Sequence, residues 1–214
     1  MIRTKSIRKK EEIANSLSHA IGVPLAVAGL VLLVVYGAIY GNAWHVVSYS
    51  IFGVSLILLY TASSVFHGAR RVRIKYHLNK FDHSAIYILI AGSYTPIALI
   101  SLNGTWGWIL FGLIWGFAIL GIIYKIFFYS AKLRWLSTAF YVMMGWLVII
   151  AINQVLTFVP EKSLWFLLAG GLSYSLGAVF YSIRKVPYFH FVFHLFILGG
   201  SICHFFSFLF LLNF

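Results

Sequence analysis

The sequence predicts an all-α membrane protein that crosses the bilayer seven times. Of its 214 residues, 62% are hydrophobic and 9% are charged. A soluble domain of this size cannot bury so much apolar surface. The apolar residues also fall into runs of roughly 20, which is the length that spans a hydrocarbon core. Composition and run length together therefore indicate a polytopic helical bundle.

Seven apolar runs can be marked as membrane spans. They cover residues 16–40, 44–67, 82–102, 106–128, 134–157, 163–183 and 190–213. The connections between them are short, and no Pro-, Gly- or Ser-rich linker and no soluble domain interrupts the chain. We therefore expect a single seven-helix transmembrane domain over residues 1–214, in which residues 1–15 form a cytoplasmic N-terminal segment.

The basic residues predict the orientation of the bundle. Of the 16 Lys and Arg residues, 15 fall in the N-terminal segment or in alternate connections on the same side, and only Lys162 falls on the other side. Cytoplasmic loops carry such an excess of Lys and Arg, so we expect the N-terminus inside and the C-terminus outside. The net charge of +12 then indicates loops that contact anionic lipid head groups, rather than nucleic-acid binding. The 15 are Arg3, Lys5, Arg8, Lys9, Lys10, Arg70, Arg71, Arg73, Lys75, Lys80, Lys125, Lys132, Arg134, Arg184 and Lys185.

Ionisable side chains gather at the predicted cytoplasmic ends of three spans. His67 closes the second span, Asp82 opens the third, and His190 and His194 open the seventh. Two helical residues four apart project from one face, about one turn from each other, which suits two ligands of a single metal ion. The alternative for this pair is that two amphipathic imidazoles extend to the membrane interface.

Three imidazoles and one carboxylate are ligand types of a catalytic zinc site, in which one position stays open for water. Such a site lowers the pKa of bound water to about 7. Asp82 could ligate the metal or act as a general base, although an acid at a helix N-terminus also favours the helix dipole. Ser63 lies one turn before His67 on the same face and could hydrogen-bond a substrate carbonyl or the bound water. Cys203 is the only cysteine, which excludes a thiolate metal cluster.

The other histidines receive weaker interpretations. His83 points about 100° away from Asp82 on a helix, so we expect it to face lipid or a loop. His204 lies about 21 Å beyond His190 along a helix, so it cannot share the same metal but could line an inner polar cavity with Ser201. For the stripe of Glu11, Asn15 and His19, the pattern favours helix capping and interfacial solvation over direct chemistry. The functional roles of His19, His83 and His204 stay open.

Four segments resemble the hemolysin III family, which belongs with the adiponectin and progestin receptors. They are EEIANSLSHAIG (11–22), SSVFH (63–67), FDHSAIYILIAGSYTP (81–96) and HFVFH (190–194). The resemblance implies seven helices in a bacterial cell membrane and a zinc ion near the cytoplasmic face. It implies that His67, His190 and His194 are the zinc ligands, that Asp82 holds the zinc-bound water, and that Ser63 lies beside it. Alkaline ceramidases have a similar layout, which suggests hydrolysis of a lipid amide.

Three functions are compatible with these residues. The leading hypothesis is a zinc-dependent hydrolase that cleaves an amide or ester of a membrane lipid. The second is a cytolytic, pore-forming protein, and the third is a receptor-like sensor in which zinc is structural. The sequence specifies neither the substrate nor the oligomeric state.

Overall fold

The computed structural model describes residues 5–128, 134–183 and 185–212, and it confirms the all-helical prediction for these residues. Of the residues discussed above, Arg3, Lys132, Arg184 and residue 213 lie outside this part of the chain. The helices are α1 (Lys5–Tyr40), α2 (Ala43–Gly68), α3 (Val72–Pro96), α4 (Thr105–Ile123), α5 (Arg134–Gly145), α6 (Ile152–Phe158), α7 (Glu161–Ser182) and α8 (Phe189–Leu209). A π-helical segment extends α3 to Leu102, another extends α4 to Phe128, and a 3₁₀ segment (Leu147–Ala151) joins α5 to α6.

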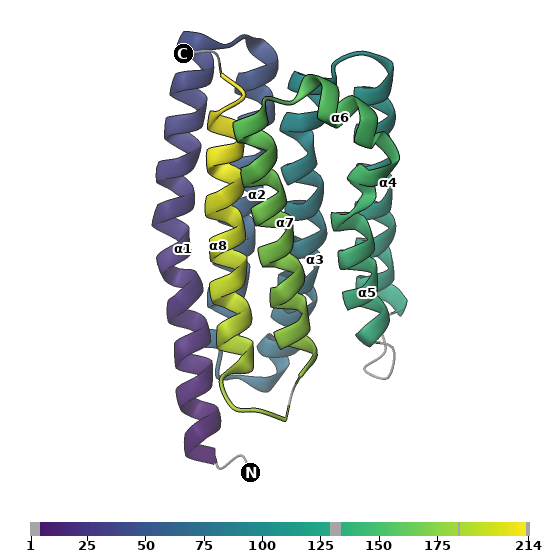
Figure 1. Cartoon of the computed structure of the whole chain (residues 1–214). Coiled ribbons are helices and arrows are strands. Elements are labelled where there is room, and N and C mark those ends of the chain that lie inside the picture. Colours follow the sequence, from purple (N-terminus) through teal and green to yellow (C-terminus); the bar gives the residue numbers. More distant parts are fainter. Residues whose placement is uncertain (1–4, 129–133, 184, 213–214) are drawn as a thin grey trace.

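Seven helical spans in the described residues are long and apolar enough to cross a membrane. Six of them are single helices or helices with a π-helical extension, and each begins or ends close to a predicted bound. The fifth span along the chain, Trp135–Phe158, is formed by α5 and α6 together. Because seven is odd, the two ends of the chain lie at opposite ends of the bundle (Figure 1). Which of these ends faces the cytoplasm stays a prediction from the distribution of Lys and Arg.

Two helices begin well before the predicted span. The prediction placed the start of the first span at residue 16 and that of the third at residue 82, whereas α1 begins at Lys5 and α3 at Val72. Lys, Arg and Glu favour helix, so a helix can continue beyond its apolar window. As a result, Lys75 and Lys80 are helical rather than in a loop, and Asp82 lies inside α3 rather than at its start.

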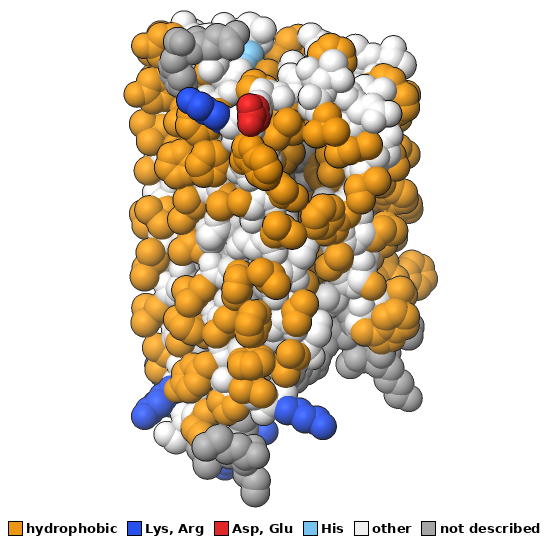
Figure 2. Space-filling view, viewed as in Figure 1, with side chains coloured by type: hydrophobic (Ala, Val, Ile, Leu, Met, Phe, Trp, Pro, Cys, Tyr) orange, Lys and Arg blue, Asp and Glu red, His pale blue; other side chains and the backbone are white. Residues whose placement is uncertain are grey.

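The helices form a bundle in which α2 and the span that begins with α3 are the most deeply buried of the seven described spans. Helix α1 packs against α2 and α8, α7 packs against α8, and α3 packs between α2 and α4 (Figure 1). The face seen in Figure 2 is covered with hydrophobic side chains, and Lys and Arg side chains lie mainly at the end that contains the N-terminus. This pattern is typical of a bundle whose exterior contacts lipid.

The start of α8 is held against α1. Tyr188, just before the helix, adopts the left-handed conformation with a φ of 63°, which is uncommon for a residue other than glycine. Its backbone N–H donates a hydrogen bond to the Glu11 carboxylate. This contact positions the first turn of α8, and with it His190, beside the N-terminal part of α1.

Candidate metal centre and adjoining cavity

The structure brings together His67, His190 and His194, the three histidines that the sequence singled out. The Nε2 atom of His190 lies 3.2 Å from Nε2 of His67 and 3.2 Å from Nε2 of His194. One ligand atom from each residue lies within 4.8 Å of the others, and His67 and His194 are buried. Two nitrogen ligands of a tetrahedral zinc ion, each about 2.0–2.1 Å from the metal, stand about 3.3–3.4 Å apart. The spacing of the imidazoles therefore fits a shared metal ion.

The far side of two of these rings determines which nitrogen faces the centre. Nδ1 of His67 lies 3.1 Å from the Glu12 carboxylate, and Nδ1 of His194 lies 3.1 Å from the backbone carbonyl of Asn15. A carboxylate and a carbonyl only accept hydrogen bonds, and the Ser18 hydroxyl, 3.0 Å from Nδ1 of His194, donates its own proton to the Asn15 carbonyl. Each Nδ1 therefore carries the proton, and each Nε2 presents a lone pair. Metal-bound histidines are oriented by partners of this kind. Lys75 in turn donates to Glu12 at 2.6 Å.

The three Nε2 atoms cannot satisfy one another without a cation. If Nε2 of His190 carries a proton, it can donate to only one of the two neighbouring lone pairs. The other contact would then place two nitrogen atoms at 3.2 Å with no hydrogen well placed between them. Leaving a buried polar atom without a hydrogen-bond partner costs free energy. A divalent metal would accept all three lone pairs, and this argument, together with the spacing, indicates that the residues fit such an ion.

Asp82 and Ser63 line the same cavity as His190 and His194. Asp82 projects from α3 and Ser63 from α2, and both are buried, at 7% and 2% exposure. Among the described residues, the ligand atoms grouped within 4.8 Å belong to the three histidines, and Asp82 is not among them. The structure thus places Asp82 and Ser63 in the same cavity wall as two of the three histidines, and their predicted chemical roles stay predictions.

His19 of α1 stacks on His194. The centroids of the two rings are 3.7 Å apart and their planes differ by 11°. Tyr60 packs edge-on against the His19 ring, with 5.1 Å between the ring centroids. His19 is buried, and neither of its ring nitrogens makes a hydrogen bond in the described structure. The interpretation of the Glu11–Asn15–His19 stripe as capping and solvation missed this contact. The i, i+4, i+8 spacing was the signal, but it does not reveal which helix the stripe faces.

The expectation that His83 faces lipid or a loop was wrong. Its side chain is buried, its Nε2 lies 2.9 Å from the hydroxyl of Tyr181 on α7, and it lines the same cavity as Asp82. Because α3 is surrounded by other helices, a rotation of 100° from Asp82 turns a side chain toward another helix rather than out of the bundle. Burial of α3 on several sides could not be seen in its sequence alone.

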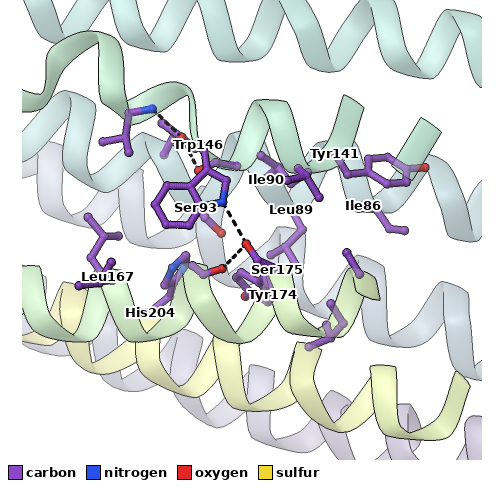
Figure 3. A pocket seen from close by; sticks show the side chains of 18 of the residues that line it. Ile86, Leu89, Ile90, Ser93, Tyr141, Trp146, Leu167, Tyr174, Ser175 and His204 are labelled. Carbon is purple, nitrogen blue, oxygen red and sulfur yellow. Dashed lines mark hydrogen bonds between the residues drawn. The ribbon is translucent and has the colours of Figure 1, made fainter. Parts of the chain in front are cut away.

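The cavity has a volume of about 470 Å³ and extends from the histidine centre toward the opposite end of α8. Its walls come from α1, α2, α3, α5, α6, α7 and α8 and are mostly aliphatic and aromatic (Figure 3). His204 also lines it, but the prediction of a polar cavity shared with Ser201 was only partly right, because the walls are mostly apolar and Ser201 is not among the lining residues. Four residues of the cavity wall are also exposed on the surface of the bundle: Ile149, Leu156, Trp165 and Leu168. The cavity therefore reaches the lipid-facing surface between α7 and the segment that contains α6.

Comparison with known proteins agrees with this architecture. The chain belongs to the haemolysin-III related family, whose sequence profile matches residues 7–205. It is 46% identical to a Hemolysin-3 homolog of Bacillus subtilis (strain 168) over 201 residues, which cover 94% of each chain. It is 44% identical to Hemolysin-3 of Bacillus cereus, covering 94% of this chain and 91% of the relative. A human protein, Monocyte to macrophage differentiation factor, is 30% identical over 92% of this chain and 82% of its own length. The predicted family and the multi-pass membrane class are thus confirmed.

Proposed function

We propose that this protein is a zinc-dependent hydrolase of the cell membrane that cleaves an amide or ester bond of a membrane lipid. One observation carries the proposal: three imidazoles have converging Nε2 atoms, and two of them, His190 and His194, line a large apolar cavity. When bound, zinc would polarise a carbonyl and lower the pKa of a water ligand. His67, His190 and His194 would hold it. Three neutral nitrogen ligands with no thiolate are typical of catalytic rather than structural zinc sites.

The remaining chemistry falls to two side chains in the cavity wall. Asp82 is the only carboxylate among the cavity-lining residues near the histidines, so it would accept a proton from the attacking water and return it to the leaving group. The Ser63 hydroxyl would donate a hydrogen bond to the carbonyl oxygen as negative charge develops there. Both groups are buried, which strengthens their electrostatic effect on a bound substrate.

The cavity supports a lipid as the substrate. Its walls are largely apolar, and part of them is exposed on the lipid-facing surface, so an acyl chain can enter sideways from the bilayer. An acyl chain held there would place its carbonyl end at the histidine centre. Anionic head groups would meet the basic residues at the same end of the bundle.

The experiment is to measure zinc by elemental analysis and lipid amide or ester hydrolysis in the same purified samples. The double variant His190→Ala/His194→Ala should lose both, whereas His77→Ala should lose neither because His77 is exposed on α3 and outside the site. Asp82→Asn should keep zinc and lose activity by 10²–10⁴-fold, roughly the contribution of a general base. Unchanged zinc content in the double variant would refute the proposal.

Two relatives carry the name Hemolysin-3, which favours membrane lysis as a second candidate function. Purified protein would then conduct ions across planar bilayers, and the conductance would persist when all three histidines are replaced. A structural zinc in a sensor predicts a different result. Metal removal would then lower the melting temperature, and the wild-type protein would hydrolyse none of the lipids extracted from its host membrane.

A further inference from the structure

Two buried polar side chains in the outer part of the cavity have no hydrogen-bond partner. His204 of α8 and Ser93 of α3 are 7% and 6% exposed, and neither the ring nitrogens of His204 nor the hydroxyl of Ser93 makes a hydrogen bond in the described structure. Both line the cavity, and both side chains are seen in its interior (Figure 3). His204 lies ten residues after His194 on α8, about 15 Å further along the helix.

The polar groups around them are satisfied. Tyr60 donates to Ser201 at 2.7 Å, and the hydroxyl of Tyr174 lies 3.0 Å from Ser201. Trp146 donates to Ser175 at 3.0 Å, and Ser175 donates to the Gly171 carbonyl at 2.8 Å (Figure 3). Since these neighbouring groups are paired within the protein, His204 and Ser93 stand out in this part of the cavity as side chains without a partner in the described structure. Buried polar groups in proteins are normally paired.

The backbone leaves room for the His204 ring at this place. A Cβ atom on Gly170 of α7 would come within 2.3 Å of Cδ2 and 2.6 Å of Nε2 of His204, so only glycine permits the observed ring position. The ring of Tyr174 packs edge-on against it at 5.1 Å. The imidazole is thus held by α7 and by the ring of Phe208, whose centroid lies 5.8 Å away, and it also lines the cavity.

The chemistry of the pair indicates what it would bind. A neutral imidazole has one donor and one acceptor, and a serine hydroxyl can act as either. Because neither nitrogen has a partner in the described structure, His204 can offer both its N–H and its lone pair to a ligand. A ligand hydroxyl donates and accepts at once, so it can serve His204 and Ser93 together. A methylene chain can serve neither.

We propose that His204 and Ser93 form a subsite for a hydroxyl group on the acyl chain of a lipid, about 15 Å from the histidine centre along α8. The apolar walls between the two places hold the intervening methylene groups. A carbon–carbon bond of about 1.5 Å advances an extended chain by slightly less than its length, so the hydroxyl lies roughly a dozen carbons from the carbonyl. The assignment takes the acyl ligand of the proposed function as given, but it concerns binding and does not require turnover.

The test is a comparison of 12-hydroxystearate with stearate by calorimetric titration of the purified protein. The wild-type protein should bind the hydroxylated chain about tenfold more tightly, the gain of roughly one net hydrogen bond or slightly more. 2-Hydroxystearate should show no such advantage, because its hydroxyl lies at the other end of the cavity. His204→Phe and Ser93→Ala should each abolish the preference while stearate binding stays as in the wild type.

Gly170→Ala provides an independent variant, since its new methyl group displaces the His204 ring without removing a polar atom. It too should lose the preference for 12-hydroxystearate.

Two results would overturn the subsite and leave water as its occupant. One is equal binding of the two ligands by the wild-type protein, and the other is a preference that persists in both His204→Phe and Ser93→Ala. Protein that contains no zinc and hydrolyses nothing, yet keeps the His204-dependent preference, would refute the hydrolase and support the subsite. A protein that binds zinc and hydrolyses lipid, yet binds stearate and 12-hydroxystearate equally, would support the hydrolase and refute the subsite.

Discussion

The Glu12 carboxylate of α1 lies 3.1 Å from Nδ1 of His67 on α2. The same carboxylate oxygen accepts a hydrogen bond from Lys75 of α3 at 2.6 Å. One acidic side chain therefore connects three helices at the candidate metal centre. It also fixes the His67 tautomer that turns Nε2 toward the other two imidazoles, so α1 contributes to the site without supplying a ligand.

This contact predicts that Glu12 controls metal affinity. Glu12→Ala should weaken zinc binding by about 10–100-fold, because Nδ1 of His67 loses its acceptor. Glu12→Gln should have a smaller effect, since the amide oxygen can still accept the hydrogen bond. Chelator competition measures the affinity, and Glu161→Gln at the other end of the bundle is the control. Equal affinities for Glu12→Ala and the wild type would show that the contact does not orient His67.

The stacking of His19 on His194 predicts a difference between two substitutions. His19→Phe keeps a flat ring at the same place and should retain zinc affinity within a few fold. His19→Ala removes an aromatic contact of about 0.5–1.5 kcal/mol and leaves a cavity, so zinc affinity and the melting temperature should both fall. Both variants are measured by chelator competition and thermal unfolding. If Phe lowers metal affinity as much as Ala does, His19 acts through its nitrogens rather than through its ring.

The predicted orientation can be checked with single cysteines. Cys203→Ala removes the only native thiol, and Lys9→Cys or Lys162→Cys then adds one at an exposed position near opposite ends of the bundle. A membrane-impermeant maleimide should label Lys162→Cys in intact spheroplasts and Lys9→Cys only after the membrane is opened. The reverse pattern would show that the positive-inside rule fails for this chain.

Two glycines of α4 predict opposite effects on stability. A Cβ atom at Gly121 would lie 2.3 Å from Cε1 of Tyr87, a fully buried ring of α3, so Gly121→Ala should destabilise the protein by about 1–3 kcal/mol. Gly112 has no atom within 4 Å of such a Cβ, and Gly112→Ala should be neutral or stabilise by up to about 1 kcal/mol. Thermal unfolding in one detergent compares the two. Similar melting temperatures would contradict the close packing of α3 on α4.

Much of the architecture follows from local features of the chain. A run of about 20 apolar residues forms a helix across a bilayer whatever its neighbours are, because the backbone must satisfy its hydrogen bonds internally. The i, i+4 spacing places His190 and His194 on one face for the same local reason. The helical continuation of α3 back to Val72 was missed, because charged residues outside the apolar window form helix as readily as loop.

What the sequence determined by itself is the class of protein, the approximate spans and the identity of three metal-ligand candidates. Only the tertiary structure decided which helices are neighbours. From that arrangement come the Glu12–His67 contact, the stacking of His19 on His194, the inward direction of His83 and the unpartnered His204 in the cavity. The physical reason is that helix periodicity specifies the face on which a residue lies, while packing between distant segments specifies what that face meets.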